Sequence, residues 1–406
     1  MEELYNYFIM SNARYDIIII GGGAAGLFLA SQLSPIKKTL ILESNDRVGK
    51  KLLSTGNGKC NLTNLDMKTI HYNHPSYVEQ FIDNYDAHDV IRAFEQMGLL
   101  TKVIDERVYP YSECSSNVLD VLRLAVQKNG VDIKTGHFAK IIDYAADGFT
   151  VSGVYKDENE TNKSFEYSAD YVVLATGSTA TFGRSSLDLY TAFGHTVKPI
   201  QPSLVPIKTD KESIKGLSGV RVNGGIRIGY RYEVGEILFK DFGVSGIAAF
   251  NMSNEISRGV AREGANILID FMPEYSLSEV EGILNKRGNV TVGELLLGMF
   301  HSKVAARLIA ASKSEESEMA PARVNAIAKV IKSYPIKIEG LGDMSLAQCT
   351  SGGLNINEFD ESLQSLKQKG LYAIGEVLDI DGDSGGFNLH WAWASAHAVA
   401  LTLNRI

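Results

Sequence analysis

Residues 15–33, YDIIIIGGGAAGLFLASQL, carry the strongest architectural signal in the chain. The apolar run ending at Ile20 predicts a strand buried on both faces, and a glycine turn and a helix follow it. Gly21, Gly23 and Gly26 fit the pattern G-x-G-x-x-G. The first glycine allows a tight turn, the second lets the backbone approach a pyrophosphate, and the third lets the helix pack on the strand.

The next segment, TLILES, predicts a second strand that ends at Glu43. A carboxylate there can accept hydrogen bonds from both ribose hydroxyls of a dinucleotide, while the N–H groups at the start of the preceding helix face the phosphates. Strand, glycine turn, helix and acid together favour a dinucleotide site. The alternative is a glycine turn of purely structural use.

The loop after Glu43 indicates which dinucleotide binds. A nicotinamide domain would usually enter its next helix at once, but here SNDRVGKKLLSTGNGKCNLTN follows. It has no helical or strand period, and its glycines, lysines and amides suit a ribityl-pyrophosphate chain and a flavin edge. We therefore expect FAD, bound in an extended form, rather than transiently bound NAD.

Composition sets the broad class. The chain has 406 residues, is 45% hydrophobic and carries a net charge of −8, so no general electrostatic attraction to nucleic acid or anionic membrane is expected. Three scattered cysteines suit a reducing cytoplasm rather than a disulfide framework. No window reaches the length of apolar sequence that a membrane span needs, and the first nine residues read as an extension before Met10.

Later segments support the flavin interpretation. The segments GVDIKTGHFAKIIDYAADGFTVSG and SFEYSADYVVLATGSTA predict a meander, and the second brings Ala175, Thr176 and Gly177 close to a cofactor. GLYAIGEVLD predicts a strand ending at Gly375 and Glu376, and a glycine loop then opens an apolar helix. The helix dipole would suit negative charge on a reduced flavin. Trp391 and Trp393 are interpreted as core residues of that helix.

The pieces GGGAAGLFLA, LLSTGNGKCNLTN, VVLATGST, TSGGLNINEF and GLYAIGEVLDIDGDSGGFNLHWAWASAHA resemble the BaiN/YhiN (HI0933-like) flavoprotein family. The resemblance implies an α/β fold, in which a glutathione-reductase-type Rossmann FAD-binding domain carries an inserted domain of antiparallel β-barrel plus helices. It also implies reduction of activated carbon–carbon double bonds, either enones of steroids and bile acids or the uracil ring of ribosomal RNA.

The resemblance also implies which residues contact the cofactor. They are expected along the pyrophosphate, the adenosine ribose, the ribityl chain and both flavin edges. The expected cofactor residues are Gly21, Gly23, Ala24, Ala25, Gly26, Glu43, Ser44, Lys50, Lys51, Leu52, Thr55, Gly56, Asn57, Gly58, Cys60, Asn61, Ala139, Ala175, Thr176, Gly177, Gly375, Glu376, Gly385, Gly386, Phe387 and Asn388.

This chain departs from the family at two positions near the last helix. Phe387 and His390 stand where the family commonly has tyrosine and glutamine, so any contact made by that hydroxyl or amide is absent or replaced. Lys240 stands where the family often has threonine. Arg184 and Lys240 are candidates for substrate or nicotinamide-phosphate contacts, with surface solvation as the alternative.

Two residues are candidates for catalysis. Cys60 is either a proton donor or redox thiol, with its pKa lowered by Lys59, or a small soft residue beneath a ring. His390 is either a proton donor to the substrate or a histidine packed on the helix face. His71, His74 and His88 lack carboxylates at metal-ligand spacing in the sequence, so no metal site is expected.

An inserted domain is expected between residues 198 and 342, flanked by cofactor-domain parts 1–197 and 343–406. The alternation in GIRIGYRYEVGEILF predicts antiparallel hairpins. SLSEVEGILNKRG and TVGELLLGMF begin with Ser or Thr and carry a nearby Glu, a helix-start signal, and HSKVAARLIAASK and ARVNAIAKVIKSY continue the helical cluster.

Three functions remain open. The first is reduction of a small cyclic enone, in which hydride from flavin N5 reaches the β-carbon and an acid protonates the α-carbon. The second is reduction of uridine in ribosomal RNA, with KRGNVTVGELLLGMFHSKVAAR as the most basic segment. The third is a flavin-binding sensor without turnover. No second strand–glycine–helix unit is present, so NAD(P)H would dock transiently or another donor would reduce the flavin; the oligomeric state stays open.

Overall fold

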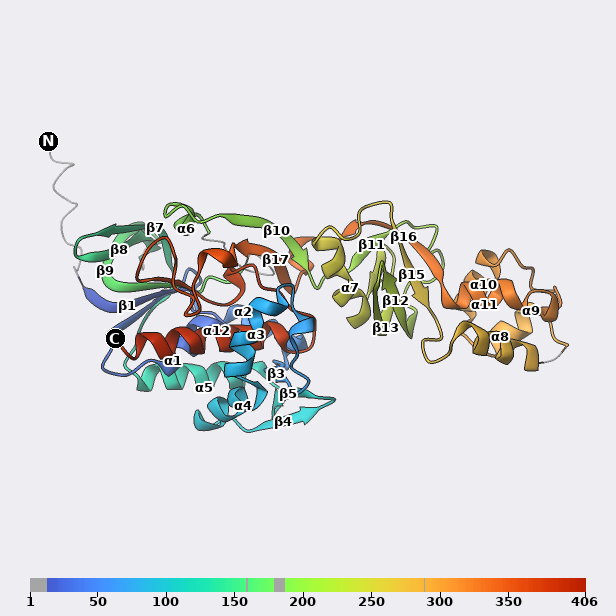
Figure 1. Ribbon diagram of the computed structural model, residues 1–406, viewed down its shortest axis with the longest axis horizontal. Helices are drawn as coiled ribbons and strands as arrows, with labels where there is room; N and C mark the ends of the chain where they lie inside the picture. Colours follow the sequence, from blue (N-terminus) through green and yellow to red (C-terminus); the bar gives the residue numbers. More distant parts are fainter. Residues whose placement is uncertain (1–12, 158–159, 179–186, 288) are drawn as a thin grey trace. The chain divides into compact units, whose positions relative to one another are not determined.

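The computed structural model describes residues 13–157, 160–178, 187–287 and 289–406 (Figure 1). Contacts divide the chain into unit 1, which comprises residues up to 201 and residues 349–406, and unit 2, Pro202–Gln348. The proposed domain borders after residues 197 and 342 remain a prediction. In the described residues no helix is long and apolar enough to cross a membrane.

Unit 1 is built on a sheet with a parallel part, as the sequence predicted. Strand β1 pairs in parallel with β2 and β9, β2 with β6, and β9 with β18. The long strand β9 also continues the antiparallel meander with β7 and β8. These strands are β1 (Arg14–Ile20), β2 (Thr39–Leu42), β6 (Asp132–Lys134), β7 (His137–Ala145), β8 (Gly148–Lys156), β9 (Asn162–Leu174) and β18 (Leu371–Ala373).

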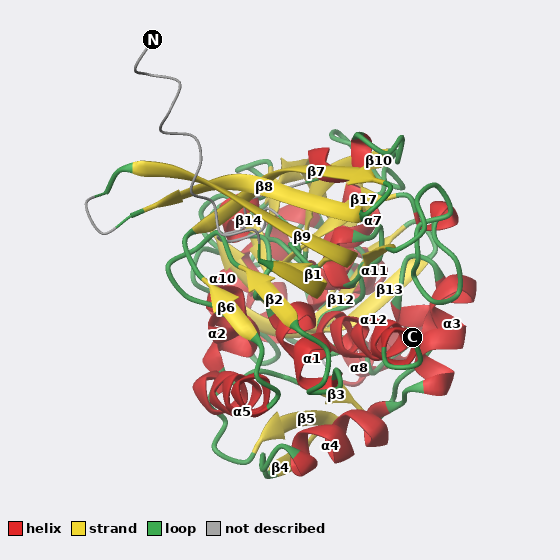
Figure 2. Cartoon of the chain, turned by 90° about the vertical axis from the view of Figure 1, so that its left-hand side faces the viewer, coloured by secondary structure: helices red, strands yellow, loops and turns green. Residues whose placement is uncertain are grey.

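Helices cover one face of the parallel part (Figure 2). Helix α1 contacts both α12 and α5, and α1 and α12 are apolar on nearly all sides, as buried helices are. The helices of unit 1 are α1 (Ala24–Gln32), α2 (Lys50–Ser54), α3 (Pro75–Asn84), α4 (Ala87–Gln96), α5 (Ser115–Lys128), α6 (Asp188–Thr191) and α12 (Phe387–Leu403).

Smaller strand groups complete unit 1. Strand β5 (Arg107–Pro110) lies between β3 (Thr63–Asn64) and β4 (Thr101–Ile104). Strands β10 (Val197–Ser203) and β17 (Cys349–Leu354) pair where the chain leaves and re-enters the unit.

Unit 2 confirms the predicted barrel and helices. Its strands close in the order β11-β14-β13-β12-β15-β16 around a packed core of buried aliphatic side chains. The predicted hairpin is β12 with β13, which pair from Arg221 with Leu238 to Ile228 with Arg231. The barrel strands are β11 (Ile207–Thr209), β12 (Arg221–Ile228), β13 (Arg231–Lys240), β14 (Gly243–Ser245), β15 (Asn266–Asp270) and β16 (Tyr334–Leu341).

The helix-start signals of unit 2 are also confirmed. Ser276 and Thr291 both form capping boxes, in which the hydroxyl accepts from the N3 backbone and the N3 glutamate accepts from the cap backbone. The helices of this unit are α7 (Ile247–Ser257), α8 (Leu277–Lys286), α9 (Val292–Leu297), α10 (Ser302–Ala311) and α11 (Val324–Lys332).

Candidate functional site

The carboxyl ends of four parallel strands meet at one edge of the unit 1 sheet. Ile20 at the end of β1 pairs with Leu42 of β2 and with Leu174 of β9, and Leu174 pairs with Ala373 of β18. We call this line the carboxyl edge. The residues that follow these strands therefore lie close together although they are far apart in sequence, and open α/β sheets bind ligands at such an edge.

The three motif glycines have three different surroundings. A Cβ on Gly21, whose φ is 115°, would lie 2.3 Å from the carbonyl oxygen of Ala175. A Cβ on Gly26 would lie 2.0 Å from the carbonyl oxygen of Gly21, so the helix packs directly on the turn. A Cβ on Gly23 would meet nothing within 4 Å. The open space at Gly23 fits the close approach of a pyrophosphate.

Helix α1 starts at this opening with a bare N-terminus. Gly23 is its N-cap, no side chain caps the helix, and the first turn carries no acidic residue. The N–H groups of Ala24, Ala25 and Gly26 belong to this first turn, where the helix dipole is positive. Such an end is suited to bind phosphate.

Glu43 follows β2 at the carboxyl edge, and its carboxylate is buried and held by the neighbouring chain. Oε2 accepts from the Gly22 backbone N–H at 2.9 Å. Oε1 accepts from the backbone and the side-chain N–H of Asn45, both at 2.7 Å, and from the Ser44 hydroxyl at 3.3 Å. Oε2 therefore keeps acceptor capacity for a ribose hydroxyl.

The loop between Lys50 and Asn64 is more regular than predicted. Residues 50–54 form helix α2 and residues 55–58 a 3-10 turn, so the expectation of no helical structure was wrong there. Gly56 and Asn57 both have φ near 55°, a left-handed conformation that glycine and asparagine tolerate better than other residues. A helix of five residues is too short to show a repeating pattern of apolar residues, so the sequence gives no sign of it.

Lys51, Ser178 and Glu376 form one polar cluster. Lys51 Nζ lies 2.5 Å from Glu376 Oε2, and the Ser178 hydroxyl donates to Glu376 Oε1 at 2.7 Å. The backbone N–H of Thr350 donates to the same oxygen at 2.9 Å. Glu376 was expected to contact the cofactor, and both of its carboxylate oxygens already have protein donors. The cluster joins α2 to the end of β9 and to the turn at Gly375.

Among the buried polar atoms that lack a hydrogen-bond partner within the described part of the chain are Asn61 Oδ1, Thr176 Oγ1 and Thr350 Oγ1. Thr176 follows β9 at the carboxyl edge, and Thr350 adjoins the Glu376 cluster. Buried polar atoms are nearly always hydrogen-bonded, so unsatisfied ones call for a ligand or water. These atoms, the open Gly23 and the bare end of α1 fit a bound dinucleotide.

The glycine loop before α12 packs on the loop after Cys60. A Cβ on Gly386, whose φ is 100°, would lie 2.8 Å from the backbone of Thr63, and Asn64 Nδ2 donates to the Gly385 carbonyl at 3.0 Å. Helix α12 then begins at Phe387 without a side-chain cap or an acid in its first turn. Tertiary packing thus brings two of the quoted motif pieces together at a second bare helix end.

Asn388, expected to contact the cofactor, is tied to its own loop. Its Oδ1 accepts from the Gly382 N–H at 2.9 Å, and its Nδ2 donates to the Gly382 carbonyl at 2.8 Å. The tryptophans confirm the core interpretation and also fix loops: Trp391 donates to the Gly375 carbonyl at 3.0 Å and Trp393 to the Leu62 carbonyl at 2.9 Å.

Cys60 does not have the environment of a reactive thiol. It is fully buried, and this burial raises its pKa to about 12. Lys59 was expected to lower that pKa, but its side chain is 53% exposed and its Nζ pairs with Glu113 Oε2 at 2.6 Å. Burial dominates this pKa, and the Lys59 charge points to Glu113, so the structure does not favour thiolate character at Cys60. The interpretation as a small packed residue is favoured.

His390 lies inside the helix layer. Its side chain is fully buried, and Nδ1 lies 2.8 Å from the Thr63 hydroxyl. Burial lowers its pKa to about 4, so the imidazole is neutral near pH 7. These facts favour the packed interpretation over the proton-donor interpretation.

The remaining expected residues have mixed surroundings. Leu52, Ala139 and Ala175 are buried, while Gly58 and Gly177 border open space where a Cβ would meet nothing within 4 Å. Arg184 lies outside the described residues, and Lys240 lies in unit 2 over the ring of Phe242. Within the described ranges no group of His, Cys, Asp or Glu could hold a metal ion.

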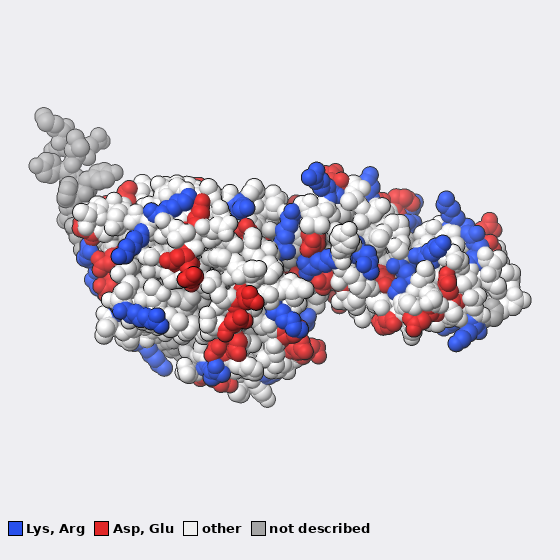
Figure 3. All heavy atoms as spheres, in the orientation of Figure 1, with Lys and Arg blue, Asp and Glu red and all other residues white. Residues whose placement is uncertain are grey.

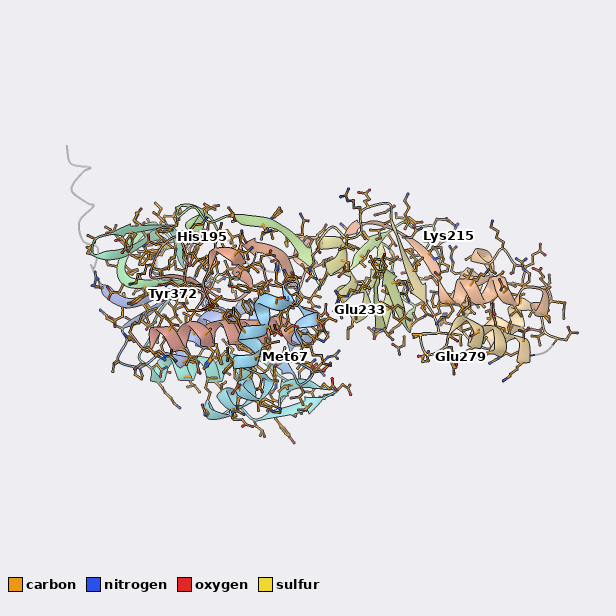
Figure 4. All side chains as sticks on the ribbon, in the orientation of Figure 1. Met67, His195, Lys215, Glu233, Glu279 and Tyr372 are labelled. Carbon is orange, nitrogen blue, oxygen red and sulfur yellow. The ribbon has the colours of Figure 1, made fainter. Side chains whose placement is uncertain are left out.

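Ser365, His195 and Glu358 form a hydrogen-bonded arrangement elsewhere in unit 1, of which Figure 4 labels His195. His195 Nε2 lies 2.7 Å from the Ser365 hydroxyl and Nδ1 3.0 Å from Glu358 Oε2. The Ser365 hydroxyl also accepts from two backbone N–H groups, and Ser365 and His195 are only 5% and 4% exposed. A substrate cannot reach this hydroxyl, so we interpret the arrangement as a structural tie.

Sequence reasoning missed two histidine–carboxylate pairs. His71 Nδ1 lies 3.1 Å from Asp383 Oδ2, and His74 Nε2 lies 3.2 Å from Asp379 Oδ2. The partners are roughly three hundred positions apart, so local spacing gave no hint of them. The alternating acids of the segment DIDGD, just before the last glycine loop, were the available signal.

Comparisons with known proteins cover nearly the whole chain. The family description "HI0933-like protein Rossmann domain" matches residues 15–402. The chain is 31% identical over 403 residues to 3-dehydro-bile acid delta(4,6)-reductase of Clostridium scindens, covering 93% of this chain and 96% of that protein. It is 27% identical over 411 residues to ribosomal RNA dihydrouridine synthase of Haemophilus influenzae, covering 96% and 98%. The structure of 3-ketosteroid-delta4-(5alpha)-dehydrogenase from Rhodococcus jostii RHA1 aligns with a TM-score of 0.49 at 14% identity, over 97% of this chain and 98% of that one.

Proposed function

Because the chain belongs to the HI0933-like Rossmann-domain family of flavoprotein oxidoreductases, we propose that it binds FAD and reduces an activated C=C bond of a small cyclic enone. The observation that carries the substrate class is the relation to a bile-acid reductase at 31% identity over 93% of this chain. Because the alignment covers 93% of this chain, it includes both the cofactor unit and the barrel unit.

Residues of the carboxyl edge would hold the cofactor. The open Gly23 and the first turn of α1 suit its pyrophosphate, and Glu43 suits the adenosine ribose. Asn61 and Thr176 offer buried oxygen atoms without other partners in the described residues. Bound FAD supplies hydride transfer to carbon.

The protein contributes orientation and charge stabilisation. The bare N-terminus of α12, after Gly385 and Gly386, provides a positive dipole end where negative charge can be stabilised. The N–H groups of Trp391 and Trp393 donate to the carbonyls of Gly375 and Leu62 and so tie two loops to α12. Rigid dipoles stabilise charge without reorganising during the reaction.

Uridine reduction in ribosomal RNA is the second candidate, favoured by the 27% identical dihydrouridine synthase. It requires cations free to meet phosphates. In the basic segment 286–307, Arg307 instead donates to the Tyr334 hydroxyl at 3.0 Å and to the Glu212 carbonyl at 2.8 Å, and Lys303 donates to the Ser218 carbonyl at 3.1 Å. Acidic and basic side chains are interspersed over unit 2 on the face in Figure 3. We therefore rank the enone first.

The experiment is an anaerobic absorbance titration of the purified protein. NADH and NADPH are added separately, and dithionite serves as a donor-independent control. The bleached protein then receives 4-androstene-3,17-dione or, separately, unmodified ribosomal RNA. Recovery of the flavin band with the steroid supports the enone proposal, and recovery with RNA alone replaces it with the second candidate. Recovery with neither, in a protein that stays reduced, contradicts both and leaves the sensor hypothesis. A protein that takes up no FAD contradicts the proposal from its first step.

A further inference from the structure

His71 lies against the start of α12. It ends the 3-10 turn η2 (Thr69–His71), and its ring stacks on Phe387, with ring centroids 4.1 Å apart and an interplanar angle of 20°. Phe387 is the first residue of α12, directly after the two glycines that pack on the loop of Asn61 and Thr63. His71 therefore borders the bare helix end at which the flavin is proposed to bind.

A buried carboxylate orients the His71 ring. Asp383 Oδ2 lies 3.1 Å from Nδ1, and the Asp383 backbone N–H donates to the His71 carbonyl at 2.9 Å. The Asp383 side chain is 7% exposed and the His71 side chain 27% exposed. Nε2 of His71 has no hydrogen-bond partner among the described residues. An imidazole held at Nδ1 by a carboxylate with its Nε2 open has the form of a general acid or base.

The other nearby candidates are less suited. Cys60 and His390 are fully buried, with a pKa of about 12 and about 4 respectively, so neither meets substrate as a ready proton donor. His74 also has a carboxylate partner, Asp379, but this pairing occupies its Nε2, and His74 is the N-cap residue of α3 with no ring contact to Phe387.

Resting on the reductase function proposed above, we propose that His71, positioned by Asp383, is the acid that protonates the α-carbon of the substrate. The Nε2–H bond breaks and a C–H bond forms at the α-carbon, while the imidazolium becomes neutral imidazole and later takes a proton from solvent. The hydride that completes the saturated bond comes from the reduced flavin, so two electrons and two hydrogens are balanced.

The first test is a chemical footprint that needs no turnover. The FAD-loaded, oxidised protein is treated with diethylpyrocarbonate, with and without 4-androstene-3,17-dione, and modified histidines are mapped by mass spectrometry. We expect the steroid to reduce modification of His71 at least about fivefold and to leave the exposed His88 on α4 unchanged. Equal modification of His71 with and without bound steroid overturns the proposal.

The second test compares His71→Gln with the matched neighbour His74→Gln. Each protein is reduced by dithionite and mixed with the steroid in a stopped-flow instrument, while steroid binding to the oxidised protein is measured separately. We expect His71→Gln to slow reoxidation roughly a hundredfold, the usual scale for losing a general acid, with binding changed less than threefold. His74→Gln should stay within about threefold in both.

The outcomes separate the two proposals. Wild-type protein that is reoxidised by the steroid at the same rate as His71→Gln overturns the role of His71 and leaves the reductase function standing. Wild-type protein that is not reoxidised by any enone overturns the reductase function, and the role of His71 falls with it. If His71→Gln does not fold, the footprint on the wild-type protein decides.

Discussion

Gly21 and Gly23 stand two positions apart in one turn, yet an added methyl group would meet opposite surroundings at the two positions. At Gly21 the φ of 115° and the carbonyl of Ala175 leave no room for a side chain. At Gly23 the backbone is ordinary for any residue, with φ of −83°, and the space beyond it is open. The first glycine is therefore required by the fold, whereas the second leaves open the space in which we propose that the cofactor binds.

This difference predicts opposite effects for two matched substitutions. Gly23→Ala should keep the melting temperature of the apoprotein within a few degrees and weaken FAD binding at least about tenfold, or about 1.4 kcal/mol. Gly21→Ala should destabilise the fold on the order of 3 kcal/mol, since it combines a strained φ with a backbone overlap. Thermal unfolding and fluorescence titration with FAD measure the two effects. Unchanged FAD affinity in Gly23→Ala would contradict the assignment of the open space.

At the scale of elements, α12 connects the cofactor loops to the core. Its tryptophans hold the carbonyls of Gly375 and Leu62, and His390 holds Thr63, all from buried positions. The helix is apolar on nearly all sides, so its polar atoms are used for these ties rather than for solvent contact. A helix of this kind sets the loop geometry, and its buried imidazole adds a dependence on pH.

His390 should make the folded state sensitive to acid. Its pKa falls from an ordinary 6.5 to about 4 in the folded state, so the unfolded chain binds more protons between these values. The contribution of His390 to the free energy of unfolding is therefore fully present above pH 6.5. It decreases by about 3 kcal/mol as the pH falls to 4. We expect His390→Asn to lose this contribution, measured by urea unfolding from pH 7 to pH 4 at fixed FAD.

The control for this measurement is His88→Asn, which removes an exposed imidazole from α4. When the pH falls from 7 to 4, the free energy of unfolding should decrease by about 3 kcal/mol more in the wild type than in His390→Asn. Parallel pH curves for wild type and His390→Asn would contradict the depressed pKa.

At the scale of the whole molecule, two separate hydrophobic cores predict two unfolding transitions. One core lies in unit 1 around the parallel strands, and the other fills the barrel and helices of unit 2. Every residue proposed to hold FAD lies in unit 1. A ligand stabilises the unit that binds it, by about 2.7 kcal/mol at a hundredfold excess over Kd.

Differential scanning calorimetry with and without FAD checks this expectation. One transition should rise in temperature as FAD is added, and the other should stay within about one degree. A single transition that moves as a whole would show that the two units unfold together, and it would contradict the proposed independence of the cofactor unit.

Features that depend on neighbouring residues could be predicted from the sequence. The strand, glycine turn and helix of residues 15–33 follow from local periodicity and from the conformational freedom of glycine. The capping boxes at Ser276 and Thr291, and the hairpin of β12 and β13, are likewise short-range patterns. Each of these features involves groups only a few positions apart, so the interactions that form it do not depend on the rest of the fold.

The pairing and burial of polar side chains could not be predicted before the fold was known. Cys60 and His390 look like reactive groups in sequence, but packing removes both from water. This burial raises the pKa of Cys60 and lowers that of His390, so both side chains are neutral near pH 7. The pairs of Lys51 with Glu376 and of His71 with Asp383 join residues more than three hundred positions apart. Their strength depends on distance and burial, and neither exists until the sheet edge and α12 have come together.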